Sequence, residues 1–481
     1  MNIMDLSNIL PEIWLISMIS FILLFDLFLS EDNKWITYLV CQITLIGLIY
    51  FVVQQVGEPS NSVFFNMFVR DDFGNLLKLL LAIIGIFVFM YSKRFILERR
   101  QYHGEYFVLC LFSLFGMYIL ISAANFLSLY LGIELLALPL YALITISKED
   151  NESPEAAMKY FVMGALASGL LLYGISLLYG VTGTLDLHEI SKALSLQPQD
   201  PHPALLFGLV FTVVGLAFKF GAVPFHLWLP DVYQGAPISV TLFIGTLPKL
   251  AAFGFAIRLL VTTFAPFNVH WQLLMMGMAI LSLGIGNIVA ILQTNLKRLL
   301  GYSTIAHVGF VFLGILAGPE AGFSAAFNYV VIYSLMALGV LGMMTAFSYQ
   351  GFEAEHIHDF KGLGVRHPWL AFLMMILMLS LSGIPPFAGF YAKLFVLNVL
   401  MTAGYTWLAV IAVLLTVVGA YYYLKVIRVM FFDAAAGSDL FGIIPKPGVA
   451  ILSLNGLAIL VLGLFPMPLF NLCTSVLQLL K

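Results

Sequence analysis

Four ionisable side chains stand deep inside apolar runs of the sequence: Glu134, Lys219, Lys249 and Lys393. Lys249 lies about half-way along its run, directly after Pro248. A charged side chain at the centre of a bilayer costs about 2.5–3.5 kcal/mol, so several of them are seldom retained for packing alone. The chemistry that amines and a carboxyl group offer at such depth is reversible protonation, and we predict that these groups carry protons. Static ion pairs that fix helix packing are the alternative.

Four further groups are candidates for the same pathway. Lys159 and Lys78 lie only a few residues from predicted helix ends, so either side chain could extend to the lipid headgroups instead. Lys159 is favoured over Lys78 because its helix follows the one that carries Glu134. Of the nine histidines, only His226 and His307 are predicted within helices, where imidazoles can relay protons. Two lone histidines could ligate a haem, but no neighbouring residue supports that assignment over a relay.

The composition places these groups in a membrane. Of the 481 residues, 61% are hydrophobic and only 10% are charged, whereas soluble proteins carry roughly 25% charged residues. A transmembrane helix needs about 20 consecutive apolar residues. This criterion predicts an all-α integral membrane protein with about fourteen transmembrane helices and no soluble domain. The helices are expected near 9–29, 35–56, 73–92, 106–122, 125–146, 156–181, 203–229, 237–263, 272–293, 298–317, 321–349, 368–401, 405–431 and 449–480.

Two of these runs contain glycine and proline at their centres: FKFGAVPFHLWLPD at 218–231 and LSGIPPFAGFYAKLF at 381–395. Proline removes a backbone donor and clashes with the preceding turn, so each helix should break there. Broken helices at membrane depth are tolerated only where protein or enclosed water satisfies the freed backbone groups. Gly221 to Phe225 aligns with Gly383 to Phe387 at a constant offset of 162 residues, which is typical of an internal repeat around an ion site.

The breaks would occupy corresponding helices of two five-helix repeats, at 106–263 and 272–431. Because five is an odd number, the two repeats must have inverted topology. An N-terminal three-helix segment at 1–105 and a C-terminal helix within 432–481 complete the predicted organisation.

The charged residues of the loops predict an orientation. With the N-terminus in the periplasm, the cytoplasmic connections hold thirteen lysines and arginines and the opposite side holds four. Cytoplasmic loops carry the excess of basic residues, so both termini are expected on the periplasmic side. The net charge of −3 and the absence of a basic cluster exclude nucleic acid as a partner. Three widely spaced cysteines exclude a CxxC metal or iron–sulfur site.

Several of these segments resemble a known family. KFGAVPFHLWLPDVYQGAP (219–237), LGIELLALPLY around Glu134, KRLLGYSTIAHVGF around His307 and LSLSGIPPFAGFYAKLFV around Lys393 are similar to the antiporter-like subunits of NADH:quinone oxidoreductase (complex I) and their Mrp-antiporter relatives. The resemblance covers nearly the whole chain. A length near 480 and no long C-terminal amphipathic extension favour the smaller type of these subunits over the larger ones.

The resemblance implies a role for each residue. Glu134 and Lys219 would form the coupled carboxylate–lysine pair of a first half-channel, and Lys249 would be the central lysine between the repeats. Lys393 would replace a glutamate that some members have at the exit side. The relay between these points, through water, would involve the remaining candidates, His226, His307 and Lys159.

The resemblance also implies the partners. The chain itself would hold no cofactor, whereas NADH, FMN, iron–sulfur clusters and quinone would bind to other subunits of the enzyme. An adjacent antiporter-like subunit and small subunits near the quinone site would contact it in the bacterial inner membrane. A Mrp-type Na⁺/H⁺ antiporter subunit and a membrane subunit of a hydrogenase-type complex are the competing functions.

The residues suggest how such a subunit would work. Burial favours the neutral form of a lysine, whereas a nearby carboxylate favours the ammonium. Moving the charge of Glu134 away from Lys219 is therefore predicted to release a proton toward Lys249. The driving force must come from outside the chain, because moving one charge against 100 mV requires about 2.3 kcal/mol.

Overall fold

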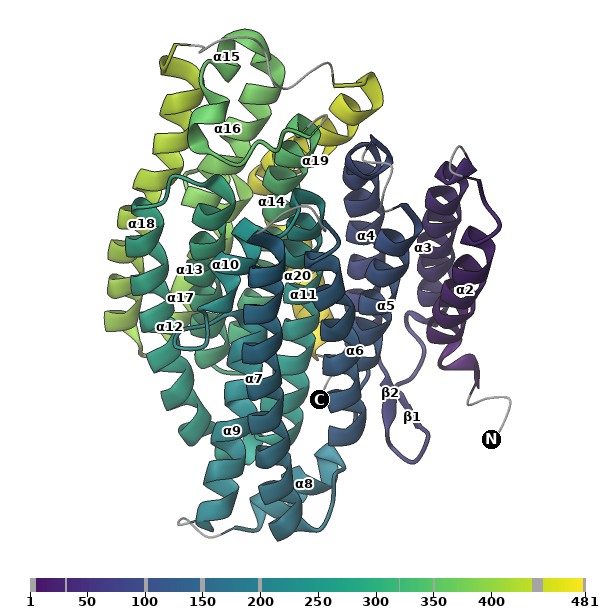
Figure 1. The fold of residues 1–481 in the computed structure, drawn as a ribbon. Coiled ribbons are helices and arrows are strands. Elements are labelled where there is room, and N and C mark those ends of the chain that lie inside the picture. Colours follow the sequence, from purple (N-terminus) through teal and green to yellow (C-terminus); the bar gives the residue numbers. More distant parts are fainter. Residues whose placement is uncertain are drawn as a thin grey trace.

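The computed structural model describes residues 6–30, 33–98, 103–147, 152–197, 201–319, 321–348, 351–434 and 444–478. Long helices run side by side in these parts of the chain (Figure 1). In lipid every backbone polar group must be paired within the protein, so the long apolar runs form helices. Their bounds are α2 Leu10–Asp26, α3 Trp35–Gln55, α4 Asp72–Glu98, α5 His103–Ile121, α6 Phe126–Ile144, α7 Glu152–Thr182, α8 Leu187–Ser195, α9 Pro203–Phe220, α10 Trp228–Gly235, α11 Ile238–Ile257, α12 Asn268–Ile291, α13 Leu296–Leu316, α14 Ala321–Phe347, α15 Leu363–Arg366, α16 Pro368–Ser382, α17 Ala388–Thr402, α18 Thr406–Phe432, α19 Lys446–Leu464 and α20 Met467–Gln478.

The fourteen predicted spans all contain helix. Twelve helical segments of the described residues are long and apolar enough to cross a membrane. The 17-residue α2 and the interrupted pair α16 and α17 account for the two remaining predictions. The last predicted span is also divided, since α19 ends at Leu464 and α20 starts at Met467.

Both predicted breaks are present. The first separates α9 from α10 over 221–227, and the second separates α16 from α17 over 383–387. Each upstream helix ends at a glycine in the left-handed region, Gly221 with φ 73° and Gly383 with φ 84°, a conformation that favours glycine because it has no Cβ. Pro224 and Pro386 each follow a cis peptide bond. Both breaks thus begin with a glycine at the end of the upstream helix.

A second pair of matching features lies at the start of α6 and α13. The side chain of Asn125 accepts a hydrogen bond from the backbone N–H of Leu127 and caps α6, while Asn295 caps α13 through Arg298. Each asparagine also forms an isolated antiparallel bridge with the segment that follows the next helix, to Asp186 and His356 respectively. Such paired details at equivalent places support the division into two repeats.

The connections lie at the two ends of the bundle. Strands β1 (Asn61–Val63) and β2 (Phe68–Arg70) form a short antiparallel hairpin at the same end as α8, and α15 lies at the opposite end (Figure 1). The sequence did not predict α8, whose residues Leu187, Ile190 and Leu194 form one buried face. Of the loop charges used for the orientation, Arg99, Arg100, Lys148 and Lys481 lie outside the described residues.

The core of the protein surrounds α11. All 20 residues of this helix are buried, and α13 and α14 are buried over most of their length. A short π-helix, η2 (Arg258–Thr263), and a 3₁₀ turn, η3 (Ala265–Phe267), connect α11 to α12. The candidate side chains Lys249 and His307 lie on α11 and α13, so the centre of the bundle carries ionisable groups.

Candidate functional site

Lys219 lies in the last turn of α9, and its Nζ atom is shielded from water and has no hydrogen-bond partner among the described residues. Glu134, on α6, accepts a 2.5 Å hydrogen bond from the hydroxyl of Ser168 on α7. The carboxylate and the ammonium do not pair in this structure, since no N–O distance of 4.0 Å or less joins them. Glu134 and Lys219 are therefore not in ion-pair contact, and the predicted switch between them stays a prediction.

Lys249 extends from the middle of α11 to the first break. Its Nζ donates a 2.8 Å hydrogen bond to the carbonyl of Phe220, the last residue of α9. It also lies 5.5 Å from the centre of the Trp228 ring, on the other side of the break. The last carbonyls of a helix have no partner within the helix and carry partial negative charge. The broken helix therefore supplies an acceptor for a buried ammonium.

Lys393 has the same relation to the second break. From α17 its Nζ donates 3.0 Å hydrogen bonds to the carbonyls of Leu381 and Ser382, at the end of α16. The Nζ atom also lies 5.5 Å from the centre of the Phe310 ring. Both breaks thus end in carbonyls that bind a lysine, although Lys249 comes from a different helix and Lys393 from the second half of the broken one.

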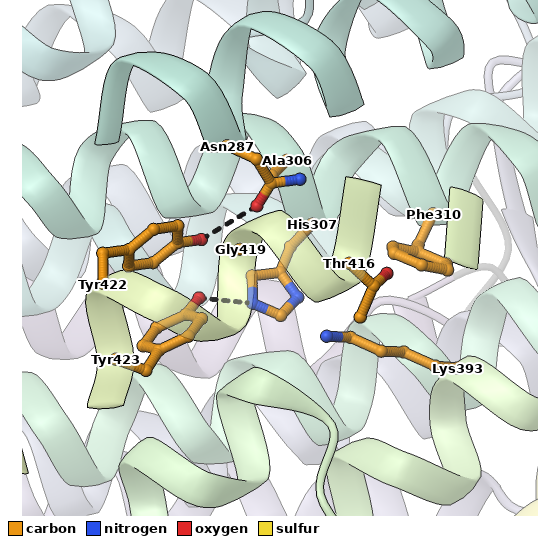
Figure 2. Close-up of a pocket in the computed structure, with 9 residues that line it drawn as sticks. All are labelled: Asn287, Ala306, His307, Phe310, Lys393, Thr416, Gly419, Tyr422 and Tyr423. Atoms are coloured by element: carbon orange, nitrogen blue, oxygen red, sulfur yellow. Dashed lines mark hydrogen bonds between the residues drawn. The ribbon is translucent and has the colours of Figure 1, made fainter. Parts of the chain in front are cut away.

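His307 is held between two tyrosines. Its Nδ1 lies 2.7 Å from the hydroxyl of Tyr329, on α14, and its Nε2 lies 3.1 Å from that of Tyr423, on α18. Figure 2 shows the imidazole between Tyr423 and the amine of Lys393. A cavity of about 10 Å³ between these groups has room for at most about one water molecule. An amine, an imidazole and two tyrosine hydroxyls, all groups that can exchange protons, thus lie around one small cavity.

Hydroxyl groups extend this polar path through the core. Tyr423 shares a 2.5 Å hydrogen bond with Ser303, on α13. The neighbouring Thr304 shares one of 2.7 Å with Tyr333 and donates another of 3.3 Å to Tyr233. These partners were not predicted from the sequence. The only signal was the occurrence of tyrosine at mid-depth in apolar helices, which packing alone also explains.

His226 lies in the first break, between α9 and α10, so the prediction that it stands within a helix is wrong. Pro224 prevents regular helix there because it lacks a backbone donor. The imidazole is 8% exposed, and its Nδ1 has no hydrogen-bond partner among the described residues. A buried ring nitrogen of this kind can accept a proton, or a hydrogen bond from a water molecule.

Lys159 lies apart from the buried lysines. Its exposed ammonium forms 2.9 Å ion pairs with Glu155 and with Asp231, on α10. Arg298 pairs with the same aspartate at 2.6 Å. Burial alone would raise the pKa of Asp231, but the hydrogen bonds and charges of Lys159 and Arg298 outweigh it and hold the pKa below its usual value. Lys159 is thus part of a surface cluster beside the first break.

Lys78 does not extend to the headgroups. Its side chain is 1% exposed and forms a 2.7 Å ion pair with Glu12, on α2. The alternative of an interfacial lysine is wrong because Glu12 pairs with the ammonium and the rings of Phe68 and Tyr118 lie against it. No group of three or more histidine, cysteine, aspartate or glutamate side chains within the described residues could hold a metal ion.

Known proteins of similar sequence span nearly the whole chain. The family model described as NADH:quinone oxidoreductase/Mrp antiporter, TM matches residues 123–419. NADH-quinone oxidoreductase subunit N of Thioalkalivibrio sulfidiphilus is 46% identical over 478 residues, and that of Acidithiobacillus ferrooxidans is 48% identical over 473 residues. Each alignment covers 98% of this chain and 98% of the relative.

Solved structures share the fold. A chain of respiratory complex I from Thermus thermophilus is 29% identical and superposes with a TM-score of 0.79 over 96% of this chain and 98% of its own. A chain of the Mrp complex from a Dietzia species has a TM-score of 0.84 at 18% identity, over 99% of this chain and 97% of its own, a likeness of fold alone. With relatives of this identity covering almost its full length, the chain belongs to the antiporter-like family of NADH:quinone oxidoreductase and Mrp subunits, in the branch of NADH-quinone oxidoreductase subunit N.

Proposed function

We propose that this chain is the antiporter-like, proton-translocating membrane subunit N of a bacterial NADH:quinone oxidoreductase. The observation that carries the proposal is the placement of three buried amines around two helix breaks. Lys219 has no hydrogen-bond partner within the described part of the chain, and Lys249 and Lys393 each bind carbonyls that a break has freed. Groups in such positions can gain and lose protons without a change in the fold.

The buried groups act in sequence along the two proposed repeats. Glu134 controls Lys219, Lys219 exchanges a proton with Lys249, and Lys249 passes it toward His307 and Lys393. His226 relays protons at the first break, and Lys159 exchanges protons at the surface beside it. The Ser168 hydroxyl supports this proposal, since it donates a hydrogen bond to the Glu134 carboxylate, which is not paired with Lys219.

Electrostatics gives the switch its direction. An amine enclosed in protein favours its neutral form, and a carboxylate brought near it favours the ammonium. When Glu134 moves to Ser168, Lys219 loses the charge that held its proton. Transfer against a membrane potential of 100 mV requires about 2.3 kcal/mol per charge, and quinone reduction elsewhere in the enzyme supplies it.

The cofactors and neighbours follow from the same proposal. NADH, FMN, iron–sulfur clusters and quinone bind to other subunits, and this chain contacts an adjacent antiporter-like subunit and the small subunits near the quinone site. It lies in the bacterial inner membrane with both termini in the periplasm. A three-helix segment at 1–105, repeats at 106–263 and 272–431, and a C-terminal segment at 432–481 form its organisation.

The competing functions have weaker support. Structures of the Mrp complex and of an archaeal sulfane sulfur reductase share the fold at 18% and 24% identity, whereas the relatives of 46–48% identity are subunits of NADH-quinone oxidoreductase. Sequence identity at full length therefore favours the redox-linked enzyme.

The test replaces Lys219 with alanine in the assembled enzyme and measures proton pumping together with quinone reduction. We expect pumping to fall about tenfold or more, because a positioned acid–base group contributes about 10²–10⁴-fold to a proton transfer. Lys192→Ala is the control, since that side chain is exposed on α8. Undiminished pumping at normal quinone reduction in the Lys219→Ala enzyme would refute the assigned role.

A further inference from the structure

A second carboxylate–lysine pair lies outside the two repeats. Glu12, near the start of α2, and Lys78, on α4, form an ion pair of 2.7 Å with side chains that are 5% and 1% exposed. Phe68 and Tyr118 enclose the ammonium, with ring centres at 4.8 and 5.8 Å. The pair is thus enclosed more completely than Lys159 and its partners, and neither member belongs to the proton path described above.

Buried oxygen atoms without hydrogen-bond partners occur at the same helix ends as this pair. Within the described residues, neither carboxylate oxygen of Glu12 accepts a hydrogen bond of regular geometry, and the side-chain oxygens of Gln55, Asn75 and Ser122 have no hydrogen-bond partner. Asn75 precedes Lys78 by one turn of α4 and donates to the backbone carbonyl of Gln55 at 3.0 Å. Buried polar atoms normally have a partner in the protein or an ordered water. Ordered water would satisfy these acceptors.

The topology places these residues at one end of the bundle. Glu12 is near the beginning of α2, Gln55 is the last residue of α3, Asn75 lies in the first turn of α4, and Ser122 follows α5. Helices that alternate in direction bring these four termini together, beside the β1–β2 hairpin (Figure 1). Lys78 follows the first residue of α4 by six positions, about 9 Å along the helix axis. The polar group therefore extends inward from the surface at this end.

Two other charged pairs lie at this end. Asp71 binds Arg258 through two hydrogen bonds of 2.6 and 2.8 Å. Arg70 pairs with Glu58 in the hairpin connection. The hydroxyl of Tyr118 donates to the backbone carbonyl of Lys78 at 2.8 Å. The Glu12–Lys78 pair differs from these two pairs in that neither Glu12 oxygen accepts a hydrogen bond of regular geometry within the described residues.

We propose that the Glu12–Lys78 pair is a further protonatable site of the translocation machinery, which exchanges protons with the water at the end of the bundle where α2 begins. Glu12 takes a proton from a hydronium ion through formation of one O–H bond, which leaves water and a neutral carboxyl beside the Lys78 ammonium. The reverse step returns the proton and restores the carboxylate. Helix α11 links this pair to the centre of the bundle. Arg258, directly after α11, binds Asp71, which lies seven residues before Lys78.

This inference rests on the proposed function, and it competes with a purely structural role in which the pair fixes α2 to α4. The double variant Glu12→Gln/Lys78→Met separates the two roles. Both replacements keep nearly the same volume, and exchanging a whole buried ion pair for neutral groups is often harmless to stability, unlike the removal of one partner. The matched control is Glu189→Gln/Lys192→Met, which removes the exposed 2.8 Å pair on α8.

The experiment measures proton pumping per NADH oxidised by the assembled enzyme in proteoliposomes. We expect the double variant to assemble and to lose pumping as the Lys219→Ala enzyme does, while the control pair has no effect. An assembled Glu12→Gln/Lys78→Met enzyme that pumps as the unaltered enzyme does would overturn the inference. If Lys219→Ala itself pumped normally, the proposed function would fail instead, so the two failures are distinguishable.

A second measurement covers the case in which the double variant does not assemble. Glu12→Asp keeps both charges, and infrared difference spectra during turnover report carboxyl groups that change protonation. We expect a carboxyl C=O band of the unaltered enzyme to shift in frequency in the Glu12→Asp enzyme. Spectra without such a shift would show that Glu12 keeps its protonation state, which contradicts the proposal.

Discussion

Lys249, on α11, donates a 2.8 Å hydrogen bond to the backbone carbonyl of Phe220, where α9 ends. The ammonium of one helix therefore binds the carbonyl end of another. Because that end carries partial negative charge, the protonated form of Lys249 is favoured at the break, and loss of the proton weakens the contact. The protonation state of the central lysine and the conformation of the first break are thus coupled.

This contact predicts how Lys249 variants behave. Lys249→Met removes the proton carrier, and we expect proton pumping to fall about tenfold or more, in line with the contribution of a positioned acid–base group. Lys249→Arg keeps a positive charge that can bind Phe220, but a guanidinium does not release its proton in proteins. Pumping assays on both variants in the assembled enzyme should therefore show the same loss. Normal pumping by Lys249→Arg would show that the lysine only caps α9.

Gly383 offers a test of the second break. Its φ of 84° favours glycine, and a Cβ there would lie 2.8 Å from Cδ and 3.0 Å from Nζ of Lys393. Gly383→Ala should displace the lysine and lower pumping about threefold or more, and it should also cost roughly 1–2 kcal/mol of stability, because an L-residue is strained in the left-handed region. Gly404→Ala is the matched control because its φ is 89° and nothing lies within 4 Å of the added carbon. Equal pumping by the two variants would contradict this explanation.

The breaks were predictable because their causes are local. Glycine and proline stand in the sequence where the helices end, and the lysines beside them are visible as charges in apolar runs. The partners of His307 were not predictable in this way. Tyr329 and Tyr423 follow it by 22 and 116 residues, and only the packing of α13 against α14 and α18 identifies them among many apolar-helix tyrosines.

The burial of Lys78 and the exposure of Lys159 were not predictable from the sequence either. Their positions near predicted helix ends look equivalent in the sequence. The structure buries Lys78 against Glu12, Phe68 and Tyr118. It leaves Lys159 on the surface beside Asp231. Distance from a helix end does not determine burial when residues of other elements cover that end.

The pair of Asp71 and Arg258 gives a prediction on stability. Burial alone would raise the pKa of Asp71, but the charge and hydrogen bonds of Arg258 outweigh it and hold the pKa below the usual value. Asp71→Asn leaves a buried guanidinium without its partner, which should lower the free energy of unfolding by about 3–5 kcal/mol. Thermal unfolding of the purified enzyme at neutral pH measures this loss.

The same pair fixes a dependence on pH. Because the pKa of Asp71 is lowered in the folded protein, its contribution is complete above the unfolded value of about 3.9 and is lost as the pH falls from there toward the folded pKa. The difference in unfolding temperature between the unaltered and Asp71→Asn proteins should thus be constant from pH 7 to about 5 and shrink below about 4. A difference that grew on acidification would have the wrong sign.

Tyr422 and Tyr423 provide a comparison between adjacent residues of α18. The hydroxyl of Tyr423 contacts Nε2 of His307 at 3.1 Å, whereas that of Tyr422 donates to Asn287 at 3.1 Å (Figure 2). Both rings are buried, and each Tyr→Phe change removes one hydroxyl at similar cost to packing.

If His307 relays protons, Tyr423→Phe should slow pumping by about threefold or more because it removes a hydrogen bond worth about 0.5–1.5 kcal/mol from the relay. Tyr422→Phe should leave pumping near normal, because its hydroxyl does not contact the imidazole. Pumping per NADH oxidised by the two assembled variants decides the matter, and an equal loss in both would mean that the hydroxyls support packing rather than the passage of a proton through His307.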